Sequence, residues 1–185
     1  MATSPKYSGL RGRRVQISGS ASQSTDPQLV KYGHALVSKV TRQILSEGGG
    51  LVLNVGKELR PSSAPPDATS LTFDWTALEA AANCLRSGCS GWSNVSGSPI
   101  QIVTSEKAVS EIPNERLSLW RELLDGGFVN VEYIQPGARS ATMMRDRQVQ
   151  LGDILLLLGG GTGVEHSARL YMDRRYPVIP IDLPL

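Results

Sequence analysis

An unbroken apolar run leads directly into a turn made almost entirely of glycine. The run covers residues 154–158, and the turn covers residues 159–163. A strand without polar alternation is typical of a parallel sheet whose two faces are both covered by helices. A helical pattern follows at residues 165–174. We therefore predict a parallel α/β sheet in which this strand is central.

Strand-like and helix-like patterns alternate along the rest of the chain, as they do in parallel sheets. Further strands are expected at residues 15–18, 51–55, 100–103, 129–134 and 178–181. Helices are expected from the spacing of Leu29, Tyr32, Leu36, Val40 and Ile44, of Trp75, Leu78, Ala82 and Leu85, of Leu117, Trp120, Leu123 and Leu124, and over residues 141–151. The predicted fold is Rossmann-like, a doubly wound and mostly parallel sheet with helices on both faces. Residues 1–14 are interpreted as a tail and residues 15–185 as one nucleotide-binding domain.

Composition excludes several classes of function. The net charge of +2 is too small to indicate nucleic-acid binding, and no apolar run approaches the length of a membrane span. Cys84 and Cys89 are expected to be free thiols of a cytoplasmic protein, because disulfides are rare in that compartment. With only two histidines and no metal-ligand spacing, neither a metal site nor a cofactor is expected. Residues 57–70 and 89–98 are expected to be loops.

The glycine turn is the strongest functional signal. Gly160, Gly161, Thr162 and Gly163 follow a buried strand and open a helix. Glycines let a ligand approach the backbone, and the N–H groups and dipole of the helix favour a phosphate. A structural turn without a ligand is the alternative. The spacing fits neither a Walker loop nor a dinucleotide fingerprint.

A second turn follows the first expected strand. Gly19, Ser20 and Ala21 lie in it, and the neighbouring serines offer hydroxyl groups. Alone this could be an ordinary polar turn. In a doubly wound sheet, however, both turns can meet at the carboxyl edge, where ligands bind.

Three charged residues near the second half of this site are candidates for ligand contacts. Glu165 could cap its helix, accept hydrogen bonds from ribose, or act on a glycosidic bond. Arg145 and Arg147 could bind a phosphate or lie on a solvated helix face. Because they lie two residues apart on a helix, at most one should face the site. We favour Arg145, which borders the side bearing Met144, Gln148 and Leu151.

The chain resembles the SLOG superfamily, a Rossmann-like group that includes the Lonely-Guy proteins. The resemblance is carried by ISGSA at residues 17–21, GGGLVLNVG at 48–56, RDRQVQLGDILLLLGGGTGVEHSA at 145–168 and YPVIPID at 176–182. Lonely-Guy enzymes have a threonine where this chain has Val164, and their glutamate lies further along than Glu165. They also have a lysine where this chain has Gln148.

With these departures the chain resembles divergent SLOG domains of bacterial antiviral systems. Those domains sense NAD-derived signals such as ADP-ribose or cyclic ADP-ribose isomers. The resemblance implies a small-molecule nucleotide ligand, a homo-oligomer and a fused or separate effector domain. The leading interpretation is thus a binding module rather than an enzyme. The alternatives are a nucleoside 5′-monophosphate phosphoribohydrolase that uses Glu165, and a ligand-free scaffold for self-association.

Overall fold

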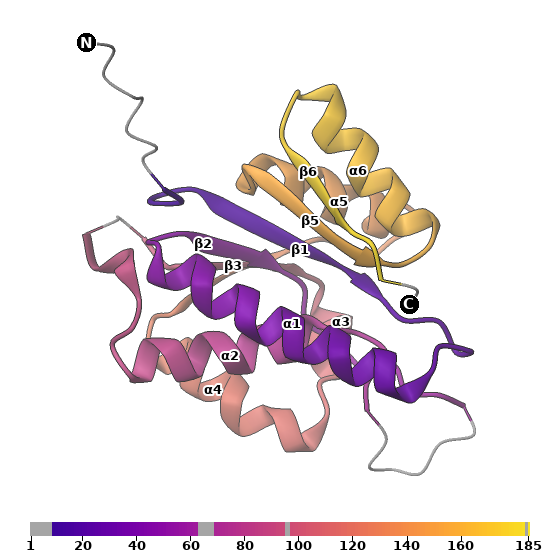
Figure 1. The fold of residues 1–185 in the computed structure, drawn as a ribbon, viewed down its shortest axis with the longest axis horizontal. Coiled ribbons are helices and arrows are strands. Elements are labelled where there is room, and N and C mark those ends of the chain that lie inside the picture. The colour runs from indigo at the N-terminus through magenta and orange to yellow at the C-terminus, as the bar shows by residue number, and fades with distance from the viewer. Residues whose placement is uncertain (1–8, 63–68, 95–96, 184) are drawn as a thin grey trace.

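The computed structural model describes residues 9–62, 69–94, 97–183 and 185, and it shows one parallel sheet flanked by helices (Figure 1). The sheet has six strands in the order β4-β3-β2-β1-β5-β6, all parallel. The strands are β1 (Arg14–Ser20), β2 (Gly50–Leu53), β3 (Ile100–Thr104), β4 (Val129–Tyr133), β5 (Ile154–Gly159) and β6 (Val178–Ile181). The predicted fold class is confirmed.

Helices lie on both faces of the sheet (Figure 1). They are α1 (Pro27–Ser46), α2 (Asp74–Arg86), α3 (Glu106–Ser110), α4 (Leu117–Asp125), α5 (Ser140–Leu151) and α6 (Thr162–Asp173), with 3-10 turns at Gly91–Asn94 and Asn114–Arg116. On one face α1, α2 and α4 pack together over the half formed by β2, β3 and β4. On the other face α5 crosses β1, β2 and β3, and α6 covers β5 and β6.

The two faces have separate cores. The larger core lies under α1, α2 and α4 and includes Trp75 and Trp120, which are 2% and 5% exposed. The smaller core joins Val149 of α5, Leu155 of β5 and Tyr171 of α6. Both tryptophans therefore stabilise the interior of this domain.

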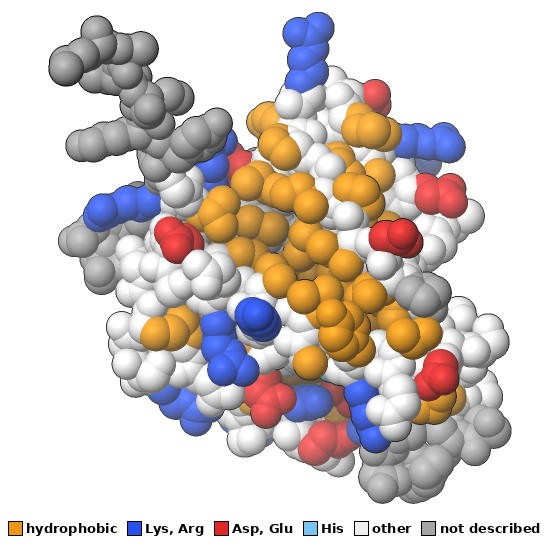
Figure 2. All heavy atoms as spheres, in the orientation of Figure 1, with side chains coloured by type: hydrophobic (Ala, Val, Ile, Leu, Met, Phe, Trp, Pro, Cys, Tyr) orange, Lys and Arg blue, Asp and Glu red, His pale blue; other side chains and the backbone are white. Residues whose placement is uncertain are grey.

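One part of the sheet has no helix over it. Because side chains alternate along a strand, Leu155 and Val178 face the smaller core, and their neighbours Ile154, Leu156 and Ile179 face the other way. In Figure 1 no described helix lies in front of β5 and β6 on this side, and Ile179 is 46% exposed, while Leu156 still joins the larger core. Figure 2 shows the resulting apolar surface. We call this surface, formed by Ile154, Ile179 and Ile181, the β5–β6 face.

The structure corrects several sequence expectations. Leu124 was expected on the inner face of its helix but is 41% exposed. The residues of α4 that are buried are Trp120 and Leu123. Strand β5 is interior but not central, and Ile154, which faces the uncovered side, and Leu157, which faces the smaller core, are only partly buried. The short α3 was not anticipated, since five residues carry no helical period.

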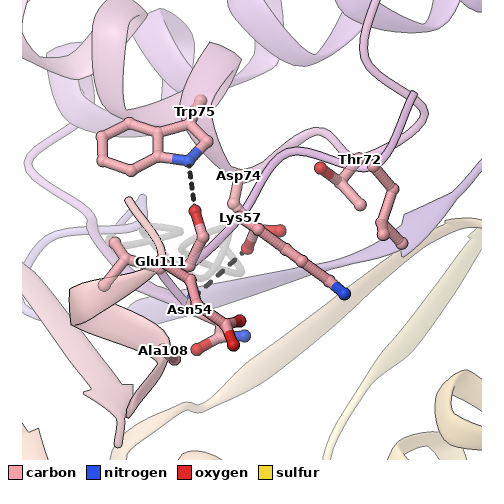
Figure 3. A pocket seen from close by; sticks show the side chains of 10 residues that line it. Asn54, Lys57, Thr72, Asp74, Trp75, Ala108 and Glu111 are labelled. Atoms are coloured by element: carbon pink, nitrogen blue, oxygen red, sulfur yellow. Dashed lines mark hydrogen bonds between the residues drawn. The ribbon is translucent and has the colours of Figure 1, made fainter. Parts of the chain in front are cut away.

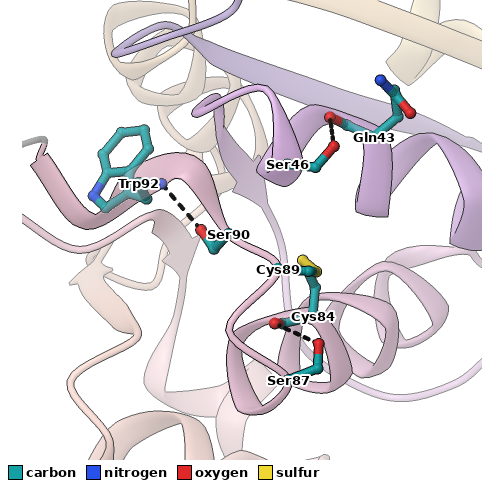
Figure 4. Close-up of a disulfide and its surroundings, with 7 residues drawn as sticks. All are labelled: Gln43, Ser46, Cys84, Ser87, Cys89, Ser90 and Trp92. Atoms are coloured by element: carbon teal, nitrogen blue, oxygen red, sulfur yellow. Dashed lines mark hydrogen bonds between the residues drawn. A yellow bond between two sulfur atoms is a disulfide. The ribbon is translucent and has the colours of Figure 1, made fainter.

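The two cysteines differ from expectation as well. The structure joins Cys84 and Cys89 in a disulfide, at the point where the chain leaves α2 (Figure 4). The Cys89 N–H donates to the Cys84 carbonyl, which brings the two Cα atoms to 5.2 Å. The expectation of two free thiols was wrong because it rested on compartment statistics and not on this local turn.

The segment before β1 is partly described. Leu10 packs against the larger core, and the Gly12 N–H donates to the Gly48 carbonyl. The first eight residues of the expected tail lie outside the described part of the chain.

Candidate functional site

The register of β1 and β5 brings the two predicted turns together. Ser18 lies level with Leu157, Gly19 with Leu158, and Ser20 with Gly159. Strands β2, β3 and β4 extend to one side of β1, and β5 and β6 lie on its other side. The order in which successive strands are added to the sheet therefore reverses between β1 and β5. Open α/β sheets bind ligands at such a point.

A hollow of about 210 Å³ lies at this point, and we call it the β1–β5 hollow. Its lining consists of Ser20, Ala21, Ser22, Gly160, Gly161 and Leu185. Four of the residues predicted to bind a ligand are therefore neighbours in space. The sequence did not indicate Leu185, which follows the last strand.

The glycines of the second turn have different roles. Gly159 and Gly160 have φ values of 60° and 96°, which L-residues rarely adopt. A Cβ at Gly160 would also overlap the Val164 side chain, whereas a Cβ at Gly161 would meet no atom within 4 Å. Gly159 and Gly160 thus form the turn, and Gly161 leaves open space in front of the helix.

Gly19 has a structural reason to be glycine. A Cβ at this position would overlap the backbone carbonyl of Leu158 on the neighbouring strand. Its small size therefore lets β1 approach β5.

Helix α6 begins at the hollow. Gly161 is its N-cap and offers no side chain to the first N–H groups. The N–H groups of Val164 and Glu165 both donate to the Gly161 carbonyl. The N–H groups of Thr162 and Gly163 lie in the first turn, where the helix offers no carbonyl one turn earlier to accept them. The first turn of α6 thus presents free donors and the positive end of a dipole.

The structure separates the two candidate arginines. Arg145 lies against Gly163, where an added Cβ would come within 2.8 Å of its Nη2 atom. It forms no ion pair or hydrogen bond with any residue that the structure describes. Arg147 instead donates to Glu132 of β4 and to Gln150. Only Arg145 therefore lies beside the first turn of α6.

Thr162 and Glu165 are exposed at the start of α6 and do not line the hollow. The Ser22 hydroxyl bonds with Ser24 and Thr25 within its own turn. Glu165 can therefore contact only a part of a ligand that extends out of the hollow.

A second cavity, of about 240 Å³, lies at the same edge, where β2 and β3 end (Figure 3). Asn54 follows β2, Asp74 begins α2, and Glu111 caps α3. Burial raises the pKa of Asp74 to about 6, although the Asn54 N–H donates to its Oδ1. Sequence patterns did not predict this cavity. Its one signal was a polar residue, Asn54, at the carboxyl end of a buried strand.

Neither cavity offers a cluster of His, Cys, Asp and Glu able to hold a metal ion within the described ranges. The described helices also include none long and apolar enough to cross a membrane. Chemically, the edge offers backbone N–H groups, the guanidinium of Arg145, hydroxyls and a buried carboxyl group.

Solved structures support the fold. DNA processing protein A from Helicobacter pylori superposes with a TM-score of 0.57 at 16% identity, covering 92% of this chain and 65% of that one. The protein of the same name from Streptococcus pneumoniae gives 0.50 at 16% identity, covering 91% and 50%. At such identities the similarity concerns the fold alone.

Sequence relatives are more informative. ATP nucleosidase Cap17 from Escherichia coli (strain KTE188) is 28% identical over 172 residues, which cover 92% of this chain and 32% of that protein. The chain thus spans about a third of the length of this relative. Residues 10–185 match the family described as ATP nucleosidase Cap17-like, N-terminal. The chain therefore belongs to the Cap17-like N-terminal family.

Proposed function

We propose that this chain is a nucleotide-sensing domain of a Cap17-like protein and binds an NAD-derived nucleotide, ADP-ribose or a cyclic ADP-ribose isomer. One observation carries the proposal. The register of β1 and β5 gathers Ser20, Ala21, Gly160 and Gly161 around one hollow, and Arg145, which bonds with no described residue, lies beside the helix that opens there.

The size of the hollow decides which part of the ligand it takes. Sites for whole drug-sized ligands typically measure about 300–1,000 Å³. At about 210 Å³ the β1–β5 hollow suits a phosphate group rather than an entire nucleotide. The N–H groups of Thr162 and Gly163 and the Arg145 guanidinium bind this phosphate, and Glu165 contacts a ribose outside the hollow.

The relatives suggest what such a sensor serves. Their name describes an ATP nucleosidase, and about two thirds of that protein lies outside the matched region. We propose that ligand binding here regulates a nucleosidase effector in antiviral defence. An NAD-derived signal is made inside the cell, so we place the protein in the cytoplasm.

A second candidate is hydrolysis of an N-glycosidic bond by this chain itself. Two observations favour it: the name of the relatives, and an exposed Glu165 at the first turn of α6. In that case Glu165 stabilises the developing ribosyl cation or positions a water. Release of free adenine from AMP or ATP, lost in Glu165→Gln, would establish this activity.

The β5–β6 face supports the homo-oligomer expected from the resemblance. Its rim carries both positive and negative side chains in Figure 2. A two-fold interface needs a surface complementary to itself, and an apolar centre with a rim of mixed charge meets that need. We propose that a second copy of the chain covers this face.

Calorimetric titration tests the proposed function. ADP-ribose, cyclic ADP-ribose isomers, NAD, ATP and AMP are compared for binding to the full chain. At about one hundred times its dissociation constant, the true ligand should add about 2.7 kcal/mol to the free energy of unfolding.

Two matched variants locate the site. Arg145→Ala should weaken binding by about tenfold to a hundredfold, because a charge-assisted hydrogen bond is lost. Arg147→Ala serves as the control, since its partners are Glu132 and Gln150. A larger loss in Arg147→Ala than in Arg145→Ala, or no binding of any nucleotide in the panel, would refute the proposal.

A further inference from the structure

The cavity at the ends of β2 and β3 lies next to the β1–β5 hollow. It is separated from the β1–β5 hollow only by a short backbone pairing, in which Thr72 forms an antiparallel bridge with Ser20. Thr72 lines the cavity and Ser20 lines the hollow. The two spaces are therefore adjacent along one edge of the sheet.

The polar lining of this cavity is rich in hydrogen-bond acceptors. Asn54 Oδ1 is buried without a hydrogen-bond partner among the described residues. The Asp74 carboxyl group accepts the Asn54 backbone N–H at 3.2 Å and has further lone pairs free to accept. Glu111 adds a second carboxylate, which Lys107 approaches only to 4.0 Å. Of these acceptors, Asn54 Oδ1 and the Asp74 carboxyl group are buried, and buried acceptors cost free energy unless a donor is supplied.

One of the residues that line this cavity is a cation. Lys57 reaches over the cavity beside Asp74 (Figure 3) and forms no ion pair with any described residue. The neighbouring carboxylate, Glu58, does not neutralise Lys57, because Arg60 and Arg116 bind Glu58 instead. A positive side chain at the mouth of the cavity disfavours a metal ion or an amine and favours an anionic group nearby.

These features together define a ligand chemistry. The ligand must bring hydrogen-bond donors for Asn54 and Asp74, must carry no positive charge, and must bear an anion close to Lys57. Vicinal hydroxyls of a phosphorylated sugar satisfy all three conditions. The apolar wall formed by Val55, Leu59 and Ala108 suits the carbon face of a sugar.

We propose that this cavity binds a ribose of the nucleotide ligand, with Asp74 and Asn54 accepting its vicinal hydroxyls and Lys57 binding the attached phosphate. The inference rests on the proposed function, because both spaces then hold parts of one ligand. Neighbouring strands are about 4.8 Å apart, so the hollow and the cavity lie about two strand spacings from each other. A pyrophosphate together with one ribose can span that distance.

The environment of Asp74 agrees with this role. Burial raises the pKa of its carboxyl group to about 6, although hydrogen bonds from the backbone of Asn54 and of Asp74 itself act to lower it. Groups kept at such a cost are common at binding sites. Sugar hydroxyls would supply further hydrogen-bond donors to the Asp74 carboxylate.

Titration of the full chain with ADP-ribose, ATP and 2′-deoxy-ATP tests the inference. Wild type should bind ATP more tightly than 2′-deoxy-ATP. Asp74→Asn should bind ADP-ribose about tenfold to a hundredfold more weakly and should lose the preference for the 2′-hydroxyl. Glu106→Gln is the matched control, because it removes one exposed carboxylate from neighbouring α3. Lys57→Gln should weaken ADP-ribose binding but leave binding of unphosphorylated adenosine unchanged.

The outcomes separate this inference from the proposed function. If Arg145→Ala loses affinity for ADP-ribose while Asp74→Asn keeps both affinity and 2′-hydroxyl preference, the cavity does not bind ribose and the proposed function stands. If ADP-ribose does not bind but adenosine binds, more tightly than 2′-deoxyadenosine and only with Asp74 present, the cavity stands and the proposed function is wrong. If neither compound binds, both are overturned.

Discussion

The guanidinium of Arg145 occupies the space that a side chain at Gly163 would need. An ideal Cβ at 163 would lie 2.8 Å from Nη2 of Arg145. The arginine comes from α5 and the glycine from the first turn of α6, so a small residue in one helix lets a cation from the other approach its N-terminus.

Gly163→Ala should therefore change stability and ligand affinity in opposite directions. Alanine is favoured over glycine inside a helix by up to about 1 kcal/mol, so the melting temperature should rise or stay level. The methyl group displaces Arg145, so affinity for ADP-ribose should fall about tenfold. Calorimetry and thermal unfolding of the same preparation measure both quantities. Unchanged affinity would show that the position of Arg145 is irrelevant to binding.

Gly19 and Gly161 should respond differently to the same substitution. Gly19→Ala places a methyl group on the Leu158 carbonyl and should cost about 1–3 kcal/mol of unfolding free energy. Gly161→Ala meets no atom within 4 Å, so stability should change little while ligand affinity falls. Urea unfolding and titration of both variants check this contrast. Equal destabilisation by the two substitutions would contradict it.

Asp74→Asn should stabilise the domain, and the gain should depend on pH. The carboxyl group has a pKa of about 6 in the folded state against an ordinary 3.8, so the folded state favours its protonated form. Ionising it in place costs about 3 kcal/mol. The stability of the wild type is therefore highest below the unfolded value and falls as pH rises through about 6.

The variant should exceed the wild type most at about pH 8, and the difference should shrink towards about pH 4. Urea denaturation across this range measures it, with Glu106→Gln as the control of equal charge change. A gain that is constant with pH would show that burial of Asp74 is not its cause.

Ile179→Lys should disrupt self-association without unfolding the domain. The side chain is 46% exposed, so its replacement leaves the free energy of unfolding within about 1 kcal/mol. A lysine in the centre of an apolar interface should convert a dimer to a monomer. Met172→Lys is the control, because Met172 is 56% exposed on α6, away from the β5–β6 face. A wild type that is monomeric by light scattering at high concentration would refute the proposed assembly.

Sequence patterns predicted those features that depend on local periodicity. The run at residues 154–158 and its glycine turn identified a strand and the start of a helix, and the phase of α5 singled out Arg145 over Arg147. Register was not predictable in this way. That Ser20 lies level with Gly159 depends on which strands become neighbours, and no single segment encodes that choice.

The cavity beyond β2 escaped prediction for a related reason. Asn54 and Asp74 are separated by a loop rich in proline and serine, and only the folded chain places the Asn54 N–H on the Asp74 carboxyl. The disulfide escaped because Cys84 and Cys89 meet through a local hydrogen bond that spacing alone does not imply.

The bridge between Ser20 and Thr72 gives the two spaces a common wall. If one ligand occupies both spaces as proposed, an occupant that displaces Ser20 in the hollow should also displace Thr72 in the cavity, since their backbones are paired. Occupancy of the two spaces is then thermodynamically linked, and linkage is reciprocal. The factor by which a bound phosphate changes the affinity for the sugar is then the factor by which a bound sugar changes the affinity for the phosphate.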